Sequence, residues 1–148
     1  MTKTIVEEKN TMQNLEKILK YDLNGKPKLS FTINEYPNFA INTQRKKDYD
    51  ALMQVFECGD YKWNHENCLP TEFDNWDLYK EDYCVSILPR KGAIFYEERR
   101  EVLAIDMRLI SAYEFYETQK ITSKMIKEIN KWFDKNKPNR ASRSLKLK

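Results

Sequence analysis

The apolar residues of this chain follow two different periods, and any fold must accommodate both. Four apolar residues lie at the spacing of one helix face: Tyr49, Leu52, Met53 and Phe56. Thr43 is the predicted N-cap of this helix, and Gly59 follows as a residue that can end it. Similar spacing predicts a helix over residues 5–22 and a last helix, capped by Thr122 or Ser123, that Pro138 closes.

Other stretches alternate apolar and polar residues, which is the period of a half-buried strand. The clearest alternation covers residues 28–34, and residues 39–42 are expected to run back beside it as a hairpin or second short strand. Further strands are predicted over residues 61–64, 83–87, 93–96 and 102–110, with a hairpin turn at residues 89–92. Residues 67–82 show no sustained period, so we expect a long ordered loop with one helical turn.

These elements predict one α+β domain over residues 1–137. The expected architecture is an antiparallel sheet of about five strands, with three helices packed mainly on one face. A chain of 148 residues buries roughly two-thirds of the surface that it exposes when unfolded, so it needs neither disulfides nor a metal to fold. Residues 138–148 are predicted to form a disordered basic tail.

Glycine and histidine are scarce, and their scarcity excludes several classes of enzyme. The chain has three glycines, too few and too scattered for a Rossmann fingerprint, a Walker phosphate loop or a nucleophile elbow. One histidine excludes a mechanism that needs two imidazoles. We therefore expect a binding protein rather than an enzyme, with no cofactor.

The three cysteines and the charged first 20 residues bear on where the protein acts. Three is an odd number, and no apolar run of a signal peptide precedes them, so we expect reduced thiols and a cytoplasmic location. No apolar stretch approaches the roughly 20 residues of a membrane helix, so no membrane partner is expected.

Charge is distributed unevenly along the chain. The formal net charge is +3, but residues 57–82 contain eight acidic residues against Lys62 and Lys80, a local net charge of −6. Residues 137–148 carry five basic residues and no acid. Such asymmetry points to charged partners and says nothing about the fold.

Residues 49–84 also carry a recognisable series of short motifs. The series is Tyr49-Asp50-x-Leu52-Met53, Gly59-Asp60-Tyr61-Lys62-Trp63, Pro70-Thr71-Glu72-Phe73, Trp76, Tyr79-Lys80 and Cys84. It resembles a small domain that recurs in uncharacterised phage and prophage proteins of low-GC Gram-positive bacteria, and the likeness covers residues 39–110. The resemblance implies a mobile-element protein that acts inside a bacterium, of the anti-defence or anti-CRISPR type, and it carries over no catalytic residue.

Four potential zinc ligands fall within 27 residues: Cys58, His65, Cys68 and Cys84. Their spacing lacks the paired knuckles of structural zinc sites, and a chain with this many apolar residues needs no metal to fold. Cys58 and Cys84 are therefore predicted to be small core residues, with His65 and Cys68 on a loop and no bound metal. No group is identifiable that would orient a catalytic pair of Cys68 and His65.

The acidic segment is the leading candidate for partner binding. Its predicted contact residues are Trp63, Glu66, Glu72, Phe73, Asp74, Trp76, Asp77 and Tyr79. A negative surface with aromatic side chains can occupy a channel whose basic residues normally hold DNA or RNA. This reading predicts an inhibitor of a host nucleic-acid-handling defence enzyme, such as a CRISPR nuclease. In the competing reading, the aromatic residues anchor a long loop onto the sheet.

A second function rests on the basic end of the chain. The candidate phosphate contacts are Lys124, Lys127, Lys131, Lys135, Arg140 and Arg143. Basic residues without compensating acids bind phosphate backbones through counterion release. The alternative prediction is therefore a nucleic-acid-binding accessory protein of a phage or mobile element, against the simpler reading of a solvated tail.

Overall fold

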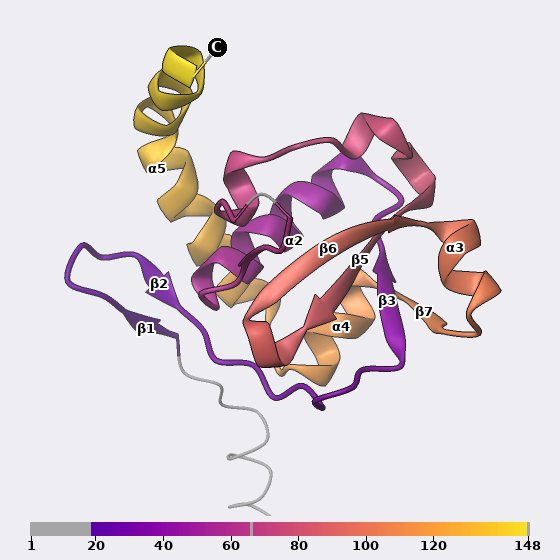
Figure 1. Ribbon diagram of the computed structural model, residues 1–148. Helices are drawn as coiled ribbons and strands as arrows, with labels where there is room; N and C mark the ends of the chain where they lie inside the picture. The colour runs from indigo at the N-terminus through magenta and orange to yellow at the C-terminus, as the bar shows by residue number, and fades with distance from the viewer. Residues whose placement is uncertain (1–18, 66, 148) are drawn as a thin grey trace, which may run out of the picture.

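A computed structural model describes residues 19–65 and 67–147, and for residues 137–147 it describes the backbone alone. The domain is a mixed α/β structure built around a five-stranded sheet (Figure 1). The strands of this sheet are β3 (Phe39–Asn42), β4 (Lys62–Trp63), β5 (Tyr83–Leu88), β6 (Ala93–Glu98) and β7 (Arg108–Ser111). A separate two-stranded ribbon is formed by β1 (Lys20–Tyr21) and β2 (Pro27–Lys28). The helices are α2 (Lys46–Cys58), α3 (Arg99–Ala104), α4 (Ala112–Thr118) and α5 (Ser123–Leu147).

The sheet has the strand order β4-β6-β5-β3-β7 and is mixed rather than antiparallel. β5 and β6 form the predicted antiparallel hairpin, with Gly92 in the left-handed conformation (φ 60°) at its turn. β3 runs antiparallel to β5 but parallel to β7, and β4 runs parallel to β6. The prediction of a wholly antiparallel sheet is wrong because long connections bring β4 and β7 back in parallel at the two edges.

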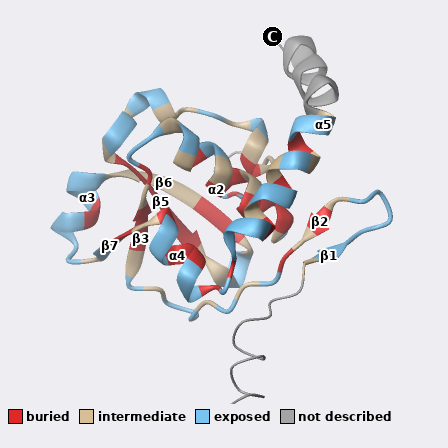
Figure 2. Cartoon of the chain, turned by 180° about the vertical axis from the view of Figure 1, so that it is seen from behind, coloured by how far each residue is buried: buried red, intermediate tan, exposed pale blue. Residues whose placement is uncertain are grey.

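Helices α2, α4 and α5 lie on one face of the sheet, as Figure 2 shows from behind. All four residues of the predicted α2 stripe are buried, among them Leu52 and Phe56 at 0% exposure. α3 packs on the opposite face, where Val102 joins a small cluster with Ala40 and Cys84. Most of the helical layer is therefore on one face as predicted, but the described part of the chain contains four helices.

The two ends of α2 are arranged differently from the prediction. The N-cap is Arg45 rather than Thr43, whose hydroxyl is buried and donates to the Tyr83 carbonyl oxygen at 3.0 Å. Gly59 follows α2 with φ −91°, and the left-handed residue is Asp60 at φ 65°. A Cβ atom at Gly59 would lie 2.0 Å from Cε2 of Phe31, so close packing requires glycine there.

The N-terminal part of the chain differs most from expectation. Residues 1–18, which include most of the predicted helix over residues 5–22, lie outside the described residues, and strand β1 falls in the last part of that range. Residues 29–34 belong to no strand, although Leu29 is buried and Phe31 and Ile33 pack against the core. The side chain of Gln119 bonds both to the Thr32 nitrogen (2.8 Å) and to its oxygen (2.9 Å). The predicted inward face is therefore correct and residues 39–42 form a short strand, β3, as one of the two alternatives expected, but the alternative of a hairpin with residues 28–34 is wrong.

The predicted strand over residues 102–110 is also wrong in its first half. Residues 99–104 form α3, where the Glu101 carboxylate accepts a hydrogen bond from the Glu98 backbone nitrogen at 2.9 Å. This capping box favours a helix over the alternation of apolar residues, and it leaves Leu103 and Ile105 more than half exposed. Only residues 108–111 join the sheet.

The last helix begins as predicted but ends later. The hydroxyl of Thr122 accepts a hydrogen bond from the Met125 nitrogen at 3.2 Å, which is the geometry of an N-cap. Met125, Ile129 and Phe133 are buried on one stripe. The helix continues past Pro138 to Leu147, so proline does not close it. The side chains of residues 137–148 lie outside the described residues.

Candidate protein-binding site

The segment between β4 and β5 is a long ordered loop, drawn in magenta along the upper edge of Figure 1. It contains three short 3-10 turns, η1 (Pro70–Glu72), η2 (Trp76–Leu78) and η3 (Lys80–Asp82). The sequence predicted the loop with a single helical turn. We call residues 67–82 the acidic loop.

Two indole groups fasten the acidic loop to the domain. Trp63 is 1% exposed, and its Nε1 donates to the Pro70 carbonyl oxygen at 3.1 Å. Trp76 is half-buried, and its Nε1 donates to the Thr43 carbonyl oxygen at 3.0 Å. Each indole thus buries apolar area and also satisfies a backbone carbonyl group.

Two phenol groups from outside the loop hold its centre. The Tyr49 hydroxyl donates to the Phe73 carbonyl oxygen at 3.0 Å, and the Tyr83 hydroxyl donates to Oδ1 of Asn75 at 2.5 Å. Burial raises the pKa of both phenols well above the ordinary value, so they remain protonated donors at neutral pH.

Between the loop and the sheet lies a continuous group of aromatic rings. The Phe73 ring centroid is 5.5 Å from that of Trp63 and 6.4 Å from that of Tyr96. Tyr96 is stacked on Tyr83 at 5.7 Å, and Tyr79 lies 6.1 Å from Tyr83. Such contacts restrict the rings that carry them, and with the hydrogen bonds above they limit the freedom of the loop backbone.

The carboxylates of the acidic loop point outward from this aromatic base. Glu72, Asp74, Asp77 and Glu81 are exposed. Glu72 accepts a hydrogen bond from the Leu69 nitrogen (3.1 Å), and Asp74 pairs with Lys46 (2.6 Å). The carboxylates of Asp77 and Glu81 form no ion pair or hydrogen bond with a described residue, so they present unneutralised charge.

The structure therefore separates the predicted contact residues into two groups. The exposed group comprises Glu72, Asp74 and Asp77, while Phe73, Trp76 and Tyr79 are half-buried beneath them. Trp63 is buried in the core and offers no surface to a partner, so its place in the predicted contact set is corrected. Glu66 lies outside the described residues.

The candidate phosphate contacts of the alternative function lie on α5. Lys124, Lys127, Lys131 and Lys135 are exposed on this helix. The side chains of Arg140 and Arg143 lie outside the described residues. Over the described ranges, no helix is both long and apolar enough to span a membrane.

The four candidate metal ligands do not gather. Cys58 ends α2 in the main core, whereas Cys84 belongs to the small cluster on the opposite face of the sheet. His65 lies among the aromatic rings, 5.2 Å from Phe73 between ring centroids. In the part of the chain that the structure describes, no three His, Cys, Asp or Glu side chains form a group that could hold a metal ion.

The thiols should differ sharply in reactivity. Burial raises the pKa of Cys58 to about 12 and that of Cys84 to about 11, whereas Cys68 is half-buried on the acidic loop. Because the thiolate is the reactive form, a disulfide reagent at pH 8 is expected to modify Cys68 first and the other two only on unfolding. Cys68→Ser should remove the fast phase; a fast phase that persists contradicts this assignment.

The same two pKa shifts set a pH dependence of stability. Cysteine in an unfolded chain ionises near pH 8.5, so the unfolded state loses these protons first as the pH rises. The contribution of Cys58 and Cys84 to the free energy of unfolding is therefore present below about pH 8.5 and declines toward pH 11 to 12.

A buried carboxylate that the sequence analysis missed lies beneath η1. Glu57 is 1% exposed, and its carboxylate pairs with Lys26 Nζ at 3.0 Å. It also accepts hydrogen bonds from the Thr71 hydroxyl (2.5 Å) and the Thr71 nitrogen (3.2 Å). Lys26 lies 5.6 Å from the ring centroid of Trp132 on α5. Glu57 thus connects the β1–β2 ribbon, α2 and the acidic loop, next to α5.

Comparison with known proteins does not identify a relative of this chain. No family model, curated protein or solved structure gives a significant match to the chain. A functional assignment therefore depends on the residues described above.

Proposed function

We propose that the protein is a binding protein whose acidic loop docks on a basic surface of a host nucleic-acid-handling defence enzyme, such as a CRISPR nuclease, and inhibits it. The observation that carries the proposal is that the loop presents exposed carboxylates while hydrogen bonds hold its backbone. Asp77 and Glu81 are exposed on η2 and η3, while Tyr49, Tyr83, Trp63 and Trp76 hold the same loop from beneath.

Rigidity matters because ordering a mobile loop on binding reduces the affinity. A loop already held by several side-chain hydrogen bonds loses little conformational freedom when it docks. Its negative charges complement a channel that binds phosphates, and they also accelerate encounter at low salt. The phage and bacterial setting of the proposal rests on the resemblance of residues 39–110 to phage and prophage proteins.

The test compares two double charge reversals that change the net charge equally. Asp77→Lys with Glu81→Lys alters the loop, and Glu117→Lys with Glu128→Lys alters exposed acids on α4 and α5. With a guide-loaded CRISPR nuclease as the probe, the loop variant should need about tenfold more protein to inhibit DNA cleavage, since tenfold corresponds to about 1.4 kcal/mol. The α4/α5 variant should inhibit like the wild type. Equal loss in both variants, or no inhibition by the wild type, contradicts the proposal.

The alternative is a nucleic-acid-binding accessory protein, favoured by the four exposed lysines of α5. It predicts that the purified protein binds DNA or RNA directly, with an affinity that falls steeply as salt is added. Replacing Lys124, Lys127, Lys131 and Lys135 by Gln should then abolish binding, whereas the loop reversal should strengthen it.

A further inference from the structure

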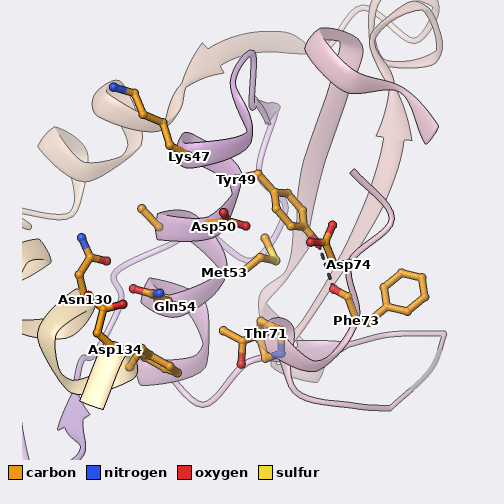
Figure 3. A pocket seen from close by; sticks show the side chains of 13 residues that line it. Lys47, Tyr49, Asp50, Met53, Gln54, Thr71, Phe73, Asp74, Asn130 and Asp134 are labelled. Atoms are coloured by element: carbon orange, nitrogen blue, oxygen red, sulfur yellow. Dashed lines mark hydrogen bonds between the residues drawn. The ribbon is translucent and has the colours of Figure 1, made fainter. Parts of the chain in front are cut away.

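A groove of about 550 Å³ lies between α2, α5 and the acidic loop (Figure 3). α2 contributes Met53 and Gln54 to its wall, η1 contributes Thr71, and α5 contributes Asn130 and Asp134. Its size falls within the range of about 300–1,000 Å³ that is usual for pockets that enclose small groups. The groove is therefore large enough to receive a long side chain from a partner.

The charges of the groove are unequal at its two ends. At the end near Tyr49, Lys46 pairs with both Asp50 and Asp74 and neutralises part of their charge. At the α5 end, Asp134 is exposed and pairs with none of the described basic side chains. Lys26 is already paired with Glu57, so it offers Asp134 no free charge. Among the three groove carboxylates, Asp134 is thus the one without an ion-pair partner in the described part of the chain; the exposed Lys131 and Lys135 are near it along α5, and Lys47 lines the groove.

A second observation at this end concerns Gln54. Its Oε1 atom is shielded from solvent and accepts no hydrogen bond from the described residues. An unmet buried acceptor costs about 1–3 kcal/mol, so a donor that reaches this oxygen would stabilise the complex. The terminal torsion of a glutamine is soft, and the amide can turn its oxygen toward a donor entering the groove.

The groove also has apolar walls. Ala51, Met53, Pro70 and Phe133 line it together with the polar residues. An apolar wall suits the methylene stem of a long basic side chain, whose charged head then reaches the acceptors. The groove therefore suits a long basic side chain, because it combines apolar walls with an unpaired carboxylate and a carbonyl acceptor that lacks a hydrogen bond.

We propose that this groove binds an arginine side chain from the basic surface of the partner, an inference that rests on the proposed function and specifies its contact. Arginine is favoured over lysine because its planar guanidinium carries five donors, enough to serve Asp134 and the Gln54 amide together. The guanidinium is also less strongly hydrated than an ammonium group, so it enters a half-enclosed groove more readily.

The test uses blocked Gly-Arg-Gly, Gly-citrulline-Gly and Gly-Lys-Gly peptides as probes of the full chain. Citrulline has the shape of arginine without its charge. NMR titration should show that the arginine peptide shifts the side-chain amide signals of Gln54 and Asn130, with at least fivefold higher affinity than either other peptide. Asp134→Asn should weaken arginine binding at least fivefold, while Glu128→Gln, which removes the same charge from α5 outside the groove, should leave it unchanged.

Three outcomes overturn the inference: equal binding of citrulline, equal binding of lysine, or equal weakening by Asp134→Asn and Glu128→Gln. The test is separate from that of the proposed function. If the protein inhibits the nuclease but does not bind the arginine peptide, the groove inference is wrong and the proposed function stands. If the arginine peptide binds but the nuclease is unaffected, the proposed partner is wrong and the groove remains an arginine site.

Discussion

Replacing Glu57 by alanine is expected to lower the free energy of unfolding by about 3–5 kcal/mol, because one partner of a buried ion pair is removed. The Glu57 side chain is 0% exposed and pairs with Lys26 Nζ at 3.0 Å. Alanine also leaves the Thr71 hydroxyl and nitrogen without their acceptor. Urea unfolding followed by tryptophan fluorescence measures the change, and the slope with urea should stay constant.

Matched variants divide this effect into its parts. Glu57→Gln keeps an acceptor for Thr71 and removes only the charge, so it should cost less than Glu57→Ala. The double variant Glu57→Gln with Lys26→Met should recover part of the lost free energy of unfolding. It removes both charges of the ion pair, so no unpaired charge is left in the core. A cost below about 1 kcal/mol for Glu57→Ala would mean that the carboxylate is solvated rather than buried.

Trp63→Ala is also expected to lower the free energy of unfolding by about 3–5 kcal/mol, the usual range for removing a large buried ring. The indole is 1% exposed and packs against Phe73 and Tyr96. Its loss opens a cavity and removes the hydrogen bond to Pro70, one of the side-chain hydrogen bonds that fix the acidic loop. Partner binding should therefore weaken as well, although Trp63 itself touches no solvent.

Thermal and urea unfolding of Trp63→Ala, Trp63→Phe and Trp76→Ala provide the comparison. Trp63→Phe keeps an aromatic ring at this position, so it should lower the free energy of unfolding less than Trp63→Ala does. Trp76 is half-buried, so Trp76→Ala should also lower it less than Trp63→Ala does. If Trp76→Ala proves the more damaging variant, the loop is held mainly at η2 rather than at the buried ring.

Local patterns in the sequence predicted burial better than they predicted pairing. Leu29, Phe31 and Ile33 turn inward as their alternation indicated, but the Gln119 side chain, distant along the chain, takes the place of a neighbouring strand. The parallel pairs β3–β7 and β4–β6 depend on contacts between residues far apart in sequence, and no local period reports them.

The candidate site was predictable only in part. The acidic loop and its exposed carboxylates follow from composition, but the buried position of Trp63 depends on how the loop folds back. Glu57 lies four residues after Met53, on the apolar stripe of α2, and this position was the available signal for a buried carboxylate. Its partners Lys26 and Thr71 come from other segments, and only the folded chain identifies them.

The order of strands in the sheet also bears on synthesis at the ribosome. β3 ends at Asn42, yet its antiparallel neighbour β5 begins at Tyr83 and its parallel neighbour β7 ends at Ser111. At about 5–20 residues per second, the nascent chain carries Ile41 and the apolar stripe of α2 for several seconds before both neighbours exist. During synthesis, the apolar residues of the N-terminal half are therefore exposed to association with other chains until the C-terminal strands have been made.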